Sequence, residues 1–80
     1  MRLDKYLKIS RLIKRRTVAN EACDNGRVSV NGLQAKASRE VKEGDIISIQ
    51  FGQKSVKVEV LKISEHVPKA EAPAMYKEIL

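Results

Sequence analysis

An Asn-Gly pair at residues 31–32 constrains the fold of this chain more than any other feature. The four residues before it, Arg27-Val28-Ser29-Val30, alternate polar and apolar side chains, as a half-buried strand does. A two-residue type I′ turn requires positive φ at both central residues, which asparagine and glycine tolerate well. We therefore predict a β-hairpin here, with a short return strand over Leu33–Lys36.

The chain after Gly44-Asp45 continues the β pattern. Residues 47–51 and residues 56–60 alternate apolar and polar side chains, and Gly52-Gln53 between them suits a two-residue turn with glycine first. The alternation changes phase at Leu61, which indicates a bulge or the end of a strand. The part of the chain that follows Gly26 is thus expected to form an antiparallel sheet.

The first 25 residues show helical spacing instead. Leu3, Tyr6 and Leu7 fall at positions i, i+3 and i+4 and give one apolar stripe, so a helix is expected over Arg2–Ile9. Asp4 lies in its first turn, where it is expected to cap the helix or to pair with Lys8 one turn later.

A second helix is expected over Thr17–Asn25. Thr17 is a candidate for the N-cap or for the first turn, and Gly26 suits the position just past the C-terminal end, where positive φ costs glycine nothing. Ser10–Arg16 would connect the two helices. The residues expected to be buried are Leu12 and Ile13 of the connector and Val18, Ala19, Ala22 and Cys23 of the helix.

These elements predict a small α+β domain in which N-terminal helices pack on a twisted antiparallel sheet. A chain of 80 residues holds one domain, and we expect it to span residues 1–63. The composition changes at Ser64: two prolines follow and periodicity is lost, so residues 64–80 are expected to be a tail. Residues 74–80 could form a short helix that docks on the domain.

Positive charge is concentrated at the start of the chain. Residues 1–16 hold seven Lys or Arg and one acid, a net charge of +6, whereas the other 64 residues hold nine basic and nine acidic side chains. Such a field is not needed for folding, and it is typical of a surface that binds a polyanion such as RNA. The candidate RNA-binding residues are Arg2, Lys5, Lys8, Arg11, Lys14, Arg15 and Arg16, with Lys36 and Arg39 extending the patch after the first hairpin.

Arg16 is the foremost of these candidates. If the second helix begins near Thr17, the guanidinium group of Arg16 would stand beside free backbone N–H groups, and both could bind one phosphate.

Catalysis, metals and membranes are not indicated. The chain has one cysteine and one histidine, His66, without the further ligands that a metal site needs, and no serine or threonine has a base in a suitable arrangement. We expect no catalytic residues, no metal and no cofactor. No apolar run approaches the length of a membrane span and no signal-peptide core is present, so a cytoplasmic protein is expected.

The order of these motifs resembles the RNA-binding domain named after ribosomal protein S4, also called the alpha-L motif. The matching residues are Arg2-Leu3-Asp4, Arg16, Gly26-Arg27-Val28, Val30-Asn31-Gly32, Lys36 and Gly44-Asp45. The resemblance implies helices packed on a twisted antiparallel sheet, and an RNA surface on the helical pair and the loop beside the first hairpin.

Two segments, Arg2–Leu7 and Leu12–Thr17, are similar to a group of small free-standing members of this family. The group comprises a ribosome-associated heat-shock protein and, closer still, the RqcP subfamily of bacterial ribosome-associated quality control. This resemblance implies a factor on stalled large ribosomal subunits that carry a peptidyl-tRNA, and we expect it to be a monomer. It would contact ribosomal RNA and the tRNA, hold the tRNA in the P site, and support alanine tailing by a candidate partner, RqcH.

Three other functions remain open at this point. The chain could be a general ribosome-associated RNA-binding or assembly factor, or a protein adaptor that uses its valine-rich sheet and tail. Two short helices also resemble a DNA-binding helix-turn-helix, although the second helix carries Glu21 and Asp24 where a recognition helix would carry cations.

Overall fold

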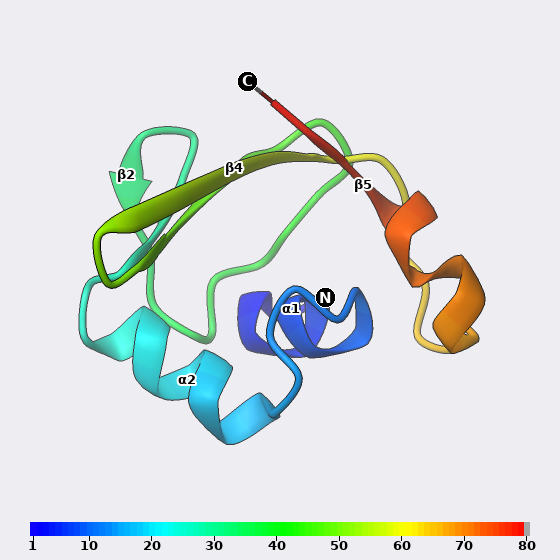
Figure 1. Ribbon diagram of the computed structural model, residues 1–80, viewed down its shortest axis with the longest axis horizontal. Helices are drawn as coiled ribbons and strands as arrows, with labels where there is room; N and C mark the ends of the chain where they lie inside the picture. The colour runs from blue at the N-terminus through cyan, green and yellow to red at the C-terminus, as the bar shows by residue number, and fades with distance from the viewer. Residues whose placement is uncertain (80) are drawn as a thin grey trace.

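Five antiparallel strands form one sheet, and both α-helices lie against one of its faces (Figure 1). The computed structural model describes residues 1–79. The elements, in chain order, are α1 (Leu3–Ile9), α2 (Arg16–Asp24), β1 (Val28–Val30), β2 (Leu33–Gln34), β3 (Ile46–Phe51), β4 (Lys54–Val60), the 3-10 helix η1 (Lys69–Met75) and β5 (Tyr76–Glu78). The strand order in the sheet is β2-β1-β3-β4-β5. The α+β fold predicted from the sequence is confirmed.

Both predicted hairpins form. Asn31 has φ 54° and Gly32 has φ 82°, as a type I′ turn requires, and Val30 pairs with Leu33 across it. Gly52, with φ 59°, begins the two-residue turn between β3 and β4. The return strand β2 is shorter than predicted, because the chain turns inward after it and buries Ala35 and Ala37.

The core lies between the sheet and α1. Alternate residues of three neighbouring strands point toward the helices and are almost fully buried: Val28, Val30, Ile47, Ile49, Val58 and Val60. From α1 they meet the predicted stripe of Leu3, Tyr6 and Leu7, each 0% exposed. Full burial of one such side chain stabilises a fold by about 1.5–3 kcal/mol, so this face of the sheet holds α1 in place.

Helix α2 begins and ends one residue earlier than predicted, and Gly26 lies just past its C-cap as expected. Gly26, with φ 77°, follows the C-cap; its N–H donates to the carbonyl of Cys23 (3.0 Å), and the next N–H donates to Ala22 (2.9 Å). This is a Schellman motif, which satisfies the last carbonyls of the helix. Arg15 holds the N-cap position, so Thr17 lies in the first turn and is not the N-cap.

Two of the expected anchor residues are less buried than predicted. Val18 is 47% exposed, because Ala19 and Cys23, one turn apart, face the core and Val18 is rotated by about 100° from Ala19 and by about 140° from Cys23. The prediction that Val18 faces inward was therefore wrong. In the connector Ile13 is buried, whereas Leu12 is half-buried.

The C-terminal segment completes the sheet. The expected helical turn over residues 74–80 is wrong for the residues described: helical structure lies earlier, in η1, and Tyr76–Glu78 is a strand. Strand β5 pairs with β4, which would otherwise present an open edge. The Tyr6 hydroxyl donates to the carbonyl of Met75 (2.8 Å), and the Met75 side chain is 0% exposed. Residue 80 lies outside the described part of the chain.

No helix within residues 1–79 is both long enough and apolar enough to cross a membrane.

Candidate nucleic-acid interface

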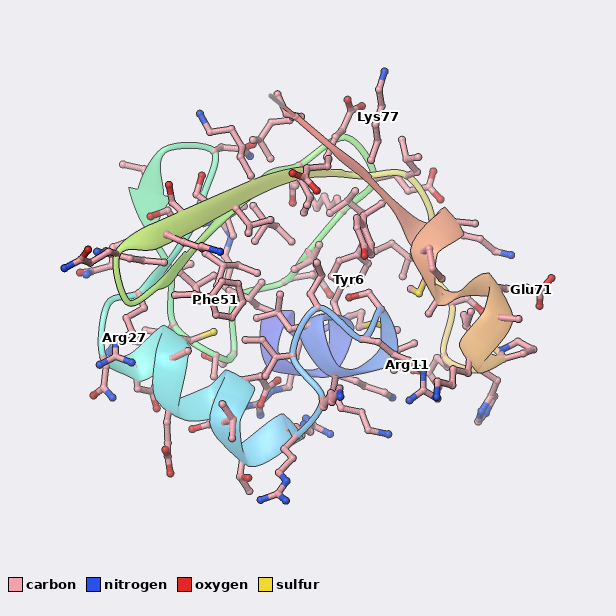
Figure 2. The ribbon with its side chains drawn as sticks, in the orientation of Figure 1. Tyr6, Arg11, Arg27, Phe51, Glu71 and Lys77 are labelled. Carbon is pink, nitrogen blue, oxygen red and sulfur yellow. The ribbon has the colours of Figure 1, made fainter. Side chains whose placement is uncertain are left out.

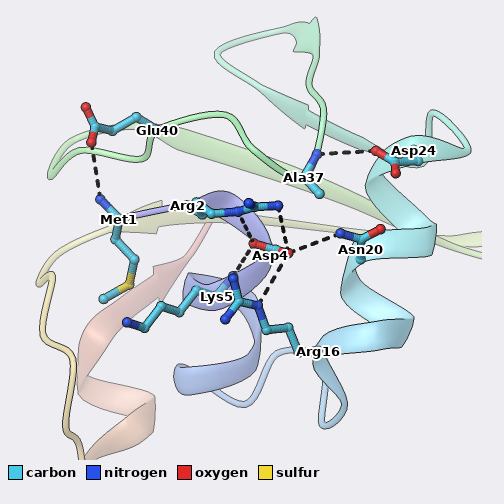
Figure 3. Close-up of polar contacts among 9 residues, drawn as sticks. All are labelled: Met1, Arg2, Asp4, Lys5, Arg16, Asn20, Asp24, Ala37 and Glu40. Carbon is cyan, nitrogen blue, oxygen red and sulfur yellow. Dashed lines mark hydrogen bonds and ion pairs between the residues drawn. The ribbon is translucent and has the colours of Figure 1, made fainter.

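One buried carboxylate, that of Asp4, lies between the two helices and joins them (Figure 3). The Asp4 side chain is 2% exposed and accepts hydrogen bonds from Arg2 Nε (3.2 Å), Arg16 Nε (3.4 Å) and Asn20 Nδ2 (3.2 Å). It also accepts one from the backbone N–H of Lys5 (2.8 Å). We call Asp4, Arg2, Arg16 and Asn20 the Asp4 cluster; it fixes where both arginines stand.

The Asp4 cluster keeps its carboxylate ionised. Burial on its own raises the pKa of Asp4, but hydrogen bonds from Asn20, Arg16 and Arg2 together outweigh it and leave the pKa below its ordinary value of 3.8. The predicted pairing with Lys8 is wrong, because the carboxylate accepts hydrogen bonds from Arg2 and the Lys5 N–H at the start of α1 and from Arg16 and Asn20 of α2 instead.

The two arginines remain open to solvent although they are paired. The Arg2 side chain is 51% exposed and that of Arg16 is 48% exposed, whereas the carboxylate between them is buried. Arg16 uses its Nε for Asp4, so the two terminal nitrogens of its guanidinium group stay available to another acceptor. Asp4 therefore orients these cations without covering them.

The loop after the first hairpin is fastened to both helices. The backbone N–H of Leu3 donates to the carbonyl of Arg39 (2.8 Å), and that of Asp4 donates to Ala37 (3.2 Å). From the other side the Ala37 N–H donates to Asp24 Oδ1 of α2 (3.5 Å). These contacts place Lys36, next to Ala37, beside the helical pair.

A groove runs from the start of α2 to this loop. It consists of two adjoining hollows, of ≈470 and ≈420 Å³, which share Arg2 and Asn20. Arg16 lines the first hollow and Lys36 lines the second. Three of the predicted RNA-binding residues, Arg2, Arg16 and Lys36, are thus brought together along one groove. Glu21 and Asp24 of α2 also line the groove and make the side formed by α2 acidic.

The other predicted cations lie around α1 and the connector. Lys8 and Arg11 line a separate hollow at the C-terminal end of α1, and Lys5 pairs with Glu65 at 3.0 Å. Lys14 and Arg15 are exposed in the connector, and Arg39 is exposed in the loop that holds the start of α1. All nine candidates are at least partly exposed: three line the groove, two line the hollow at the end of α1, and the other four lie outside both.

Reasoning from the sequence missed Asn20 and the central role of Asp4. Asn20 carries no motif, and only the tertiary packing of α2 on α1 brings it to Asp4. Asp4 did offer a signal, because it is the one acid among the first 16 residues of a strongly basic segment.

Two buried side chains elsewhere in the described residues, Cys23 and Tyr6, have raised pKa values. Burial, with Asp4 and Asp24 nearby, raises the pKa of Cys23 to about 11, so its thiol stays protonated at neutral pH. Burial, followed by the neighbouring Tyr76, raises the pKa of Tyr6 as well. Residues 1–79 contain no group of three or more His, Cys, Asp or Glu side chains placed to hold a metal ion.

Comparison with known proteins agrees with this geometry. The family model of the S4 domain matches residues 1–47, which include both helices, the Asp4 cluster and the first hairpin. The chain belongs to the S4 domain family, and the resemblance seen in the sequence is confirmed.

Within that family its relatives carry a more specific name. The chain is 59% identical to the "RQC P-site tRNA stabilizing factor" of Halalkalibacterium halodurans, over 95% of this chain and 86% of the relative. It is 58% identical to the Bacillus subtilis protein of the same name, over 95% of this chain and 88% of that protein. With the Streptococcus pneumoniae protein of this name the identity is 52%, over 99% and 90%.

Two solved structures share the whole fold. One is the trimeric structure of Vibrio cholerae heat shock protein 15, with a TM-score of 0.91 and 34% identity over 99% of this chain and 81% of that chain. The other is the solution structure of HP1423, with a TM-score of 0.84 and 36% identity over 100% of this chain and 98% of that chain. Both alignments run past the S4 match and include the C-terminal segment.

Proposed function

We propose that this chain is a non-catalytic RNA-binding factor of ribosome-associated quality control. It binds large ribosomal subunits that still carry a peptidyl-tRNA after stalling, contacts ribosomal RNA and the tRNA, and stabilises the tRNA in the P site. In doing so it supports the addition of C-terminal alanines by RqcH. The RNA-binding unit in this proposal is residues 1–63, and the C-terminal segment completes its sheet. The factor acts as a monomer in the cytoplasm.

The observation that carries the proposal is the identity of 52–59%, over nearly the whole chain, to factors named for stabilising P-site tRNA. The structure supports it independently, because Arg2, Arg16 and Lys36 line one groove at the surface of the helical pair.

The groove suits the phosphate backbone of folded RNA. An arginine fork can bind two phosphate oxygens, and Asp4 holds the forks of Arg2 and Arg16 in place before RNA arrives. No side chain within residues 1–79 caps the start of α2, so its first-turn N–H groups can join Arg16 on one phosphate. Stabilisation of the tRNA is then a matter of linkage, since the factor favours the ribosomal state whose RNA it contacts.

Binding to DNA as a helix-turn-helix is not supported. After Arg16, at its first position, α2 carries Glu21 and Asp24 and no further Lys or Arg. Insertion of α2 into the major groove of a duplex would place both acids among its phosphates, with Arg16 as the one cation of this helix to offset them.

The test compares Arg16→Ala with Lys54→Ala, which removes an exposed cation from β4. Binding is measured by sedimentation with large subunits that carry a peptidyl-tRNA and with vacant subunits, over a range of salt concentrations. Arg16→Ala is expected to weaken binding and to flatten the log–log salt dependence by about 1, whereas Lys54→Ala leaves both near wild type.

The same variants are tested for alanine addition with RqcH. The proposal predicts loss with Arg16→Ala and preference of the wild type for subunits that hold the tRNA. Equal binding to vacant subunits would instead indicate a general ribosome-associated factor, and binding that survives nuclease treatment would indicate a protein adaptor.

A further inference from the structure

A hollow separate from the groove lies at the opposite end of α1 from the Asp4 cluster. It is open, has a volume of ≈470 Å³, and is formed between the end of α1 and the segment that leads into η1. Its lining residues are Lys8, Ile9, Arg11, Glu65, His66, Val67 and Pro68. Figure 2 shows Arg11 between α1 and that segment. The volume falls within the range of about 300–1,000 Å³ that small-ligand sites occupy.

The hollow carries net positive charge. Its one carboxylate, Glu65, is paired with Lys5 at 3.0 Å. Lys8 and Arg11 are both exposed and have no acidic partner within residues 1–79. Two cations therefore face the hollow without compensation, which favours an anionic ligand.

The backbone of Arg11 supports a use for its side chain. Arg11 has φ 63°, in the left-handed region, and it follows the C-cap of α1. Glycine is the usual residue at this position because a side chain there costs free energy. An arginine in a conformation that favours glycine destabilises the folded state locally, and such strained residues tend to persist where they have a function.

The hollow also has an apolar side. Ile9 and Val67 are half-buried and pack against the core, and Pro68 lies beside them. His66 adds an exposed aromatic ring. A ligand that combines an anionic group with a flat, weakly polar ring matches this arrangement, because bases stack on rings and apolar side chains while cations meet the phosphate.

We propose that this hollow receives one unstacked nucleotide of the bound RNA. Its phosphate lies between Lys8 and Arg11, and its base lies against His66, Val67 and Pro68. This inference rests on the proposed function and extends it, because it assigns the C-terminal segment a part in RNA binding. It also gives the protein a preference for RNA with single-stranded or bulged nucleotides beside a helix.

The first test follows the nuclear magnetic resonance signals of the full chain at fixed pH. The probes are a five-nucleotide single-stranded uridine RNA, a duplex RNA and inorganic phosphate. We expect the single strand to shift the signals of Arg11, His66 and Val67, with much smaller shifts from duplex RNA. Equal shifts with phosphate alone would reduce the hollow to an anion site and overturn the proposal, as would the absence of shifts with the single strand.

The second test uses two double variants of matched charge. Lys8→Gln with Arg11→Gly removes the cations of the hollow, and Arg11→Gly also relieves the left-handed backbone. Lys54→Gln with Lys57→Gln removes two exposed cations from β4, whose turn with β3 lies at the other end of the sheet (Figure 1).

The hollow variant is expected to bind the single strand about ten-fold more weakly, with a salt dependence flatter by about 1.4. The control is expected to stay within about three-fold of wild type. Equal losses in both variants would overturn the assignment. Subunit binding by Arg16→Ala is scored separately, so failure of this inference leaves the proposed function standing, and failure of the proposed function is seen first at Arg16.

Discussion

Replacement of Asp4 by asparagine separates two roles that its carboxylate can have. The change keeps the size of the side chain and removes the charge on which Arg2 and Arg16 converge. A hydrogen bond to a charged group is worth about 1.5–3 kcal/mol when buried. Both arginines are about half exposed and regain hydration when the charge of the carboxylate is lost, so their hydrogen bonds contribute less than fully buried ones. We therefore expect the free energy of unfolding to fall by about 2–3 kcal/mol.

That loss corresponds to a large shift in melting temperature. For a chain of 80 residues the entropy of unfolding is about 170 cal/mol/K, so 1 kcal/mol moves the midpoint by about 6 °C. Asp4→Asn should therefore melt about 12–18 °C below the wild type. Glu71→Gln, which removes an exposed carboxylate from η1, is the matched control and should melt within about 3 °C of it.

The effect on RNA binding distinguishes positioning from neutralisation. If Asp4 only offsets charge, its removal leaves the groove one unit more positive and should strengthen binding to stalled subunits. If Asp4 positions the two guanidinium groups, binding to stalled subunits should weaken, while non-specific binding to unstructured RNA is kept or increased.

Circular dichroism melts and sedimentation with subunits, both well below the melting temperature of the variant, measure the two effects. We expect lower stability together with weaker binding to stalled subunits. An unchanged melting temperature, or tighter binding to stalled subunits, would refute the positioning role of Asp4.

Three further predictions concern the pH dependence and the packing of the fold. The pKa of Asp4 is lowered in the folded state, so its contribution to the free energy of unfolding is complete above the ordinary value of 3.8 and is lost as pH falls below it. In thermal melts from about pH 5 to about pH 2, the melting temperature of the wild type should therefore fall more steeply than that of Asp4→Asn. Gly26→Ala should cost about 1–2 kcal/mol in denaturant unfolding, since φ is 77° there and a Cβ atom would collide with the Gln34 side chain; an unchanged midpoint would contradict the Schellman ending. Tyr6→Phe should lower the free energy of unfolding by only about 1 kcal/mol in the same assay, because the Met75 carbonyl keeps two backbone donors when the hydroxyl is lost. A loss above about 3 kcal/mol would contradict this account of the hydroxyl.

The parts of the fold that local rules decide could be predicted from the sequence. The turn at Asn31-Gly32 and the place of Gly26 after α2 follow from backbone conformations that only a few residue types favour. The alternation of residues 47–51 and 56–60 follows from the two-residue period of a strand that buries one face. The packing of the helices against these strands follows from the need to bury one face of the sheet.

The parts that depend on contacts between distant residues could not be predicted. Asp4 was assigned to its own helix because local pairing is the default, yet its partners Arg16 and Asn20 come from α2. Strand β5 has three residues and no clear alternation, so its pairing depends on the open edge of β4. Val18 shows the same limit, since the face that α2 buries is set by how it packs on α1.

The bond between the Tyr6 hydroxyl and the Met75 carbonyl spans 69 residues and bears on how the protein is made. The Asp4 cluster lies within the first 20 residues, so the groove arginines can find their carboxylate while most of the chain is still being translated. Tyr6 and the open edge of β4 must wait until residues 69–78 have emerged. Folding of the domain is therefore expected to finish only after this segment has emerged, and a nascent chain cut short before it would expose apolar surface and an unpaired strand, both of which promote aggregation.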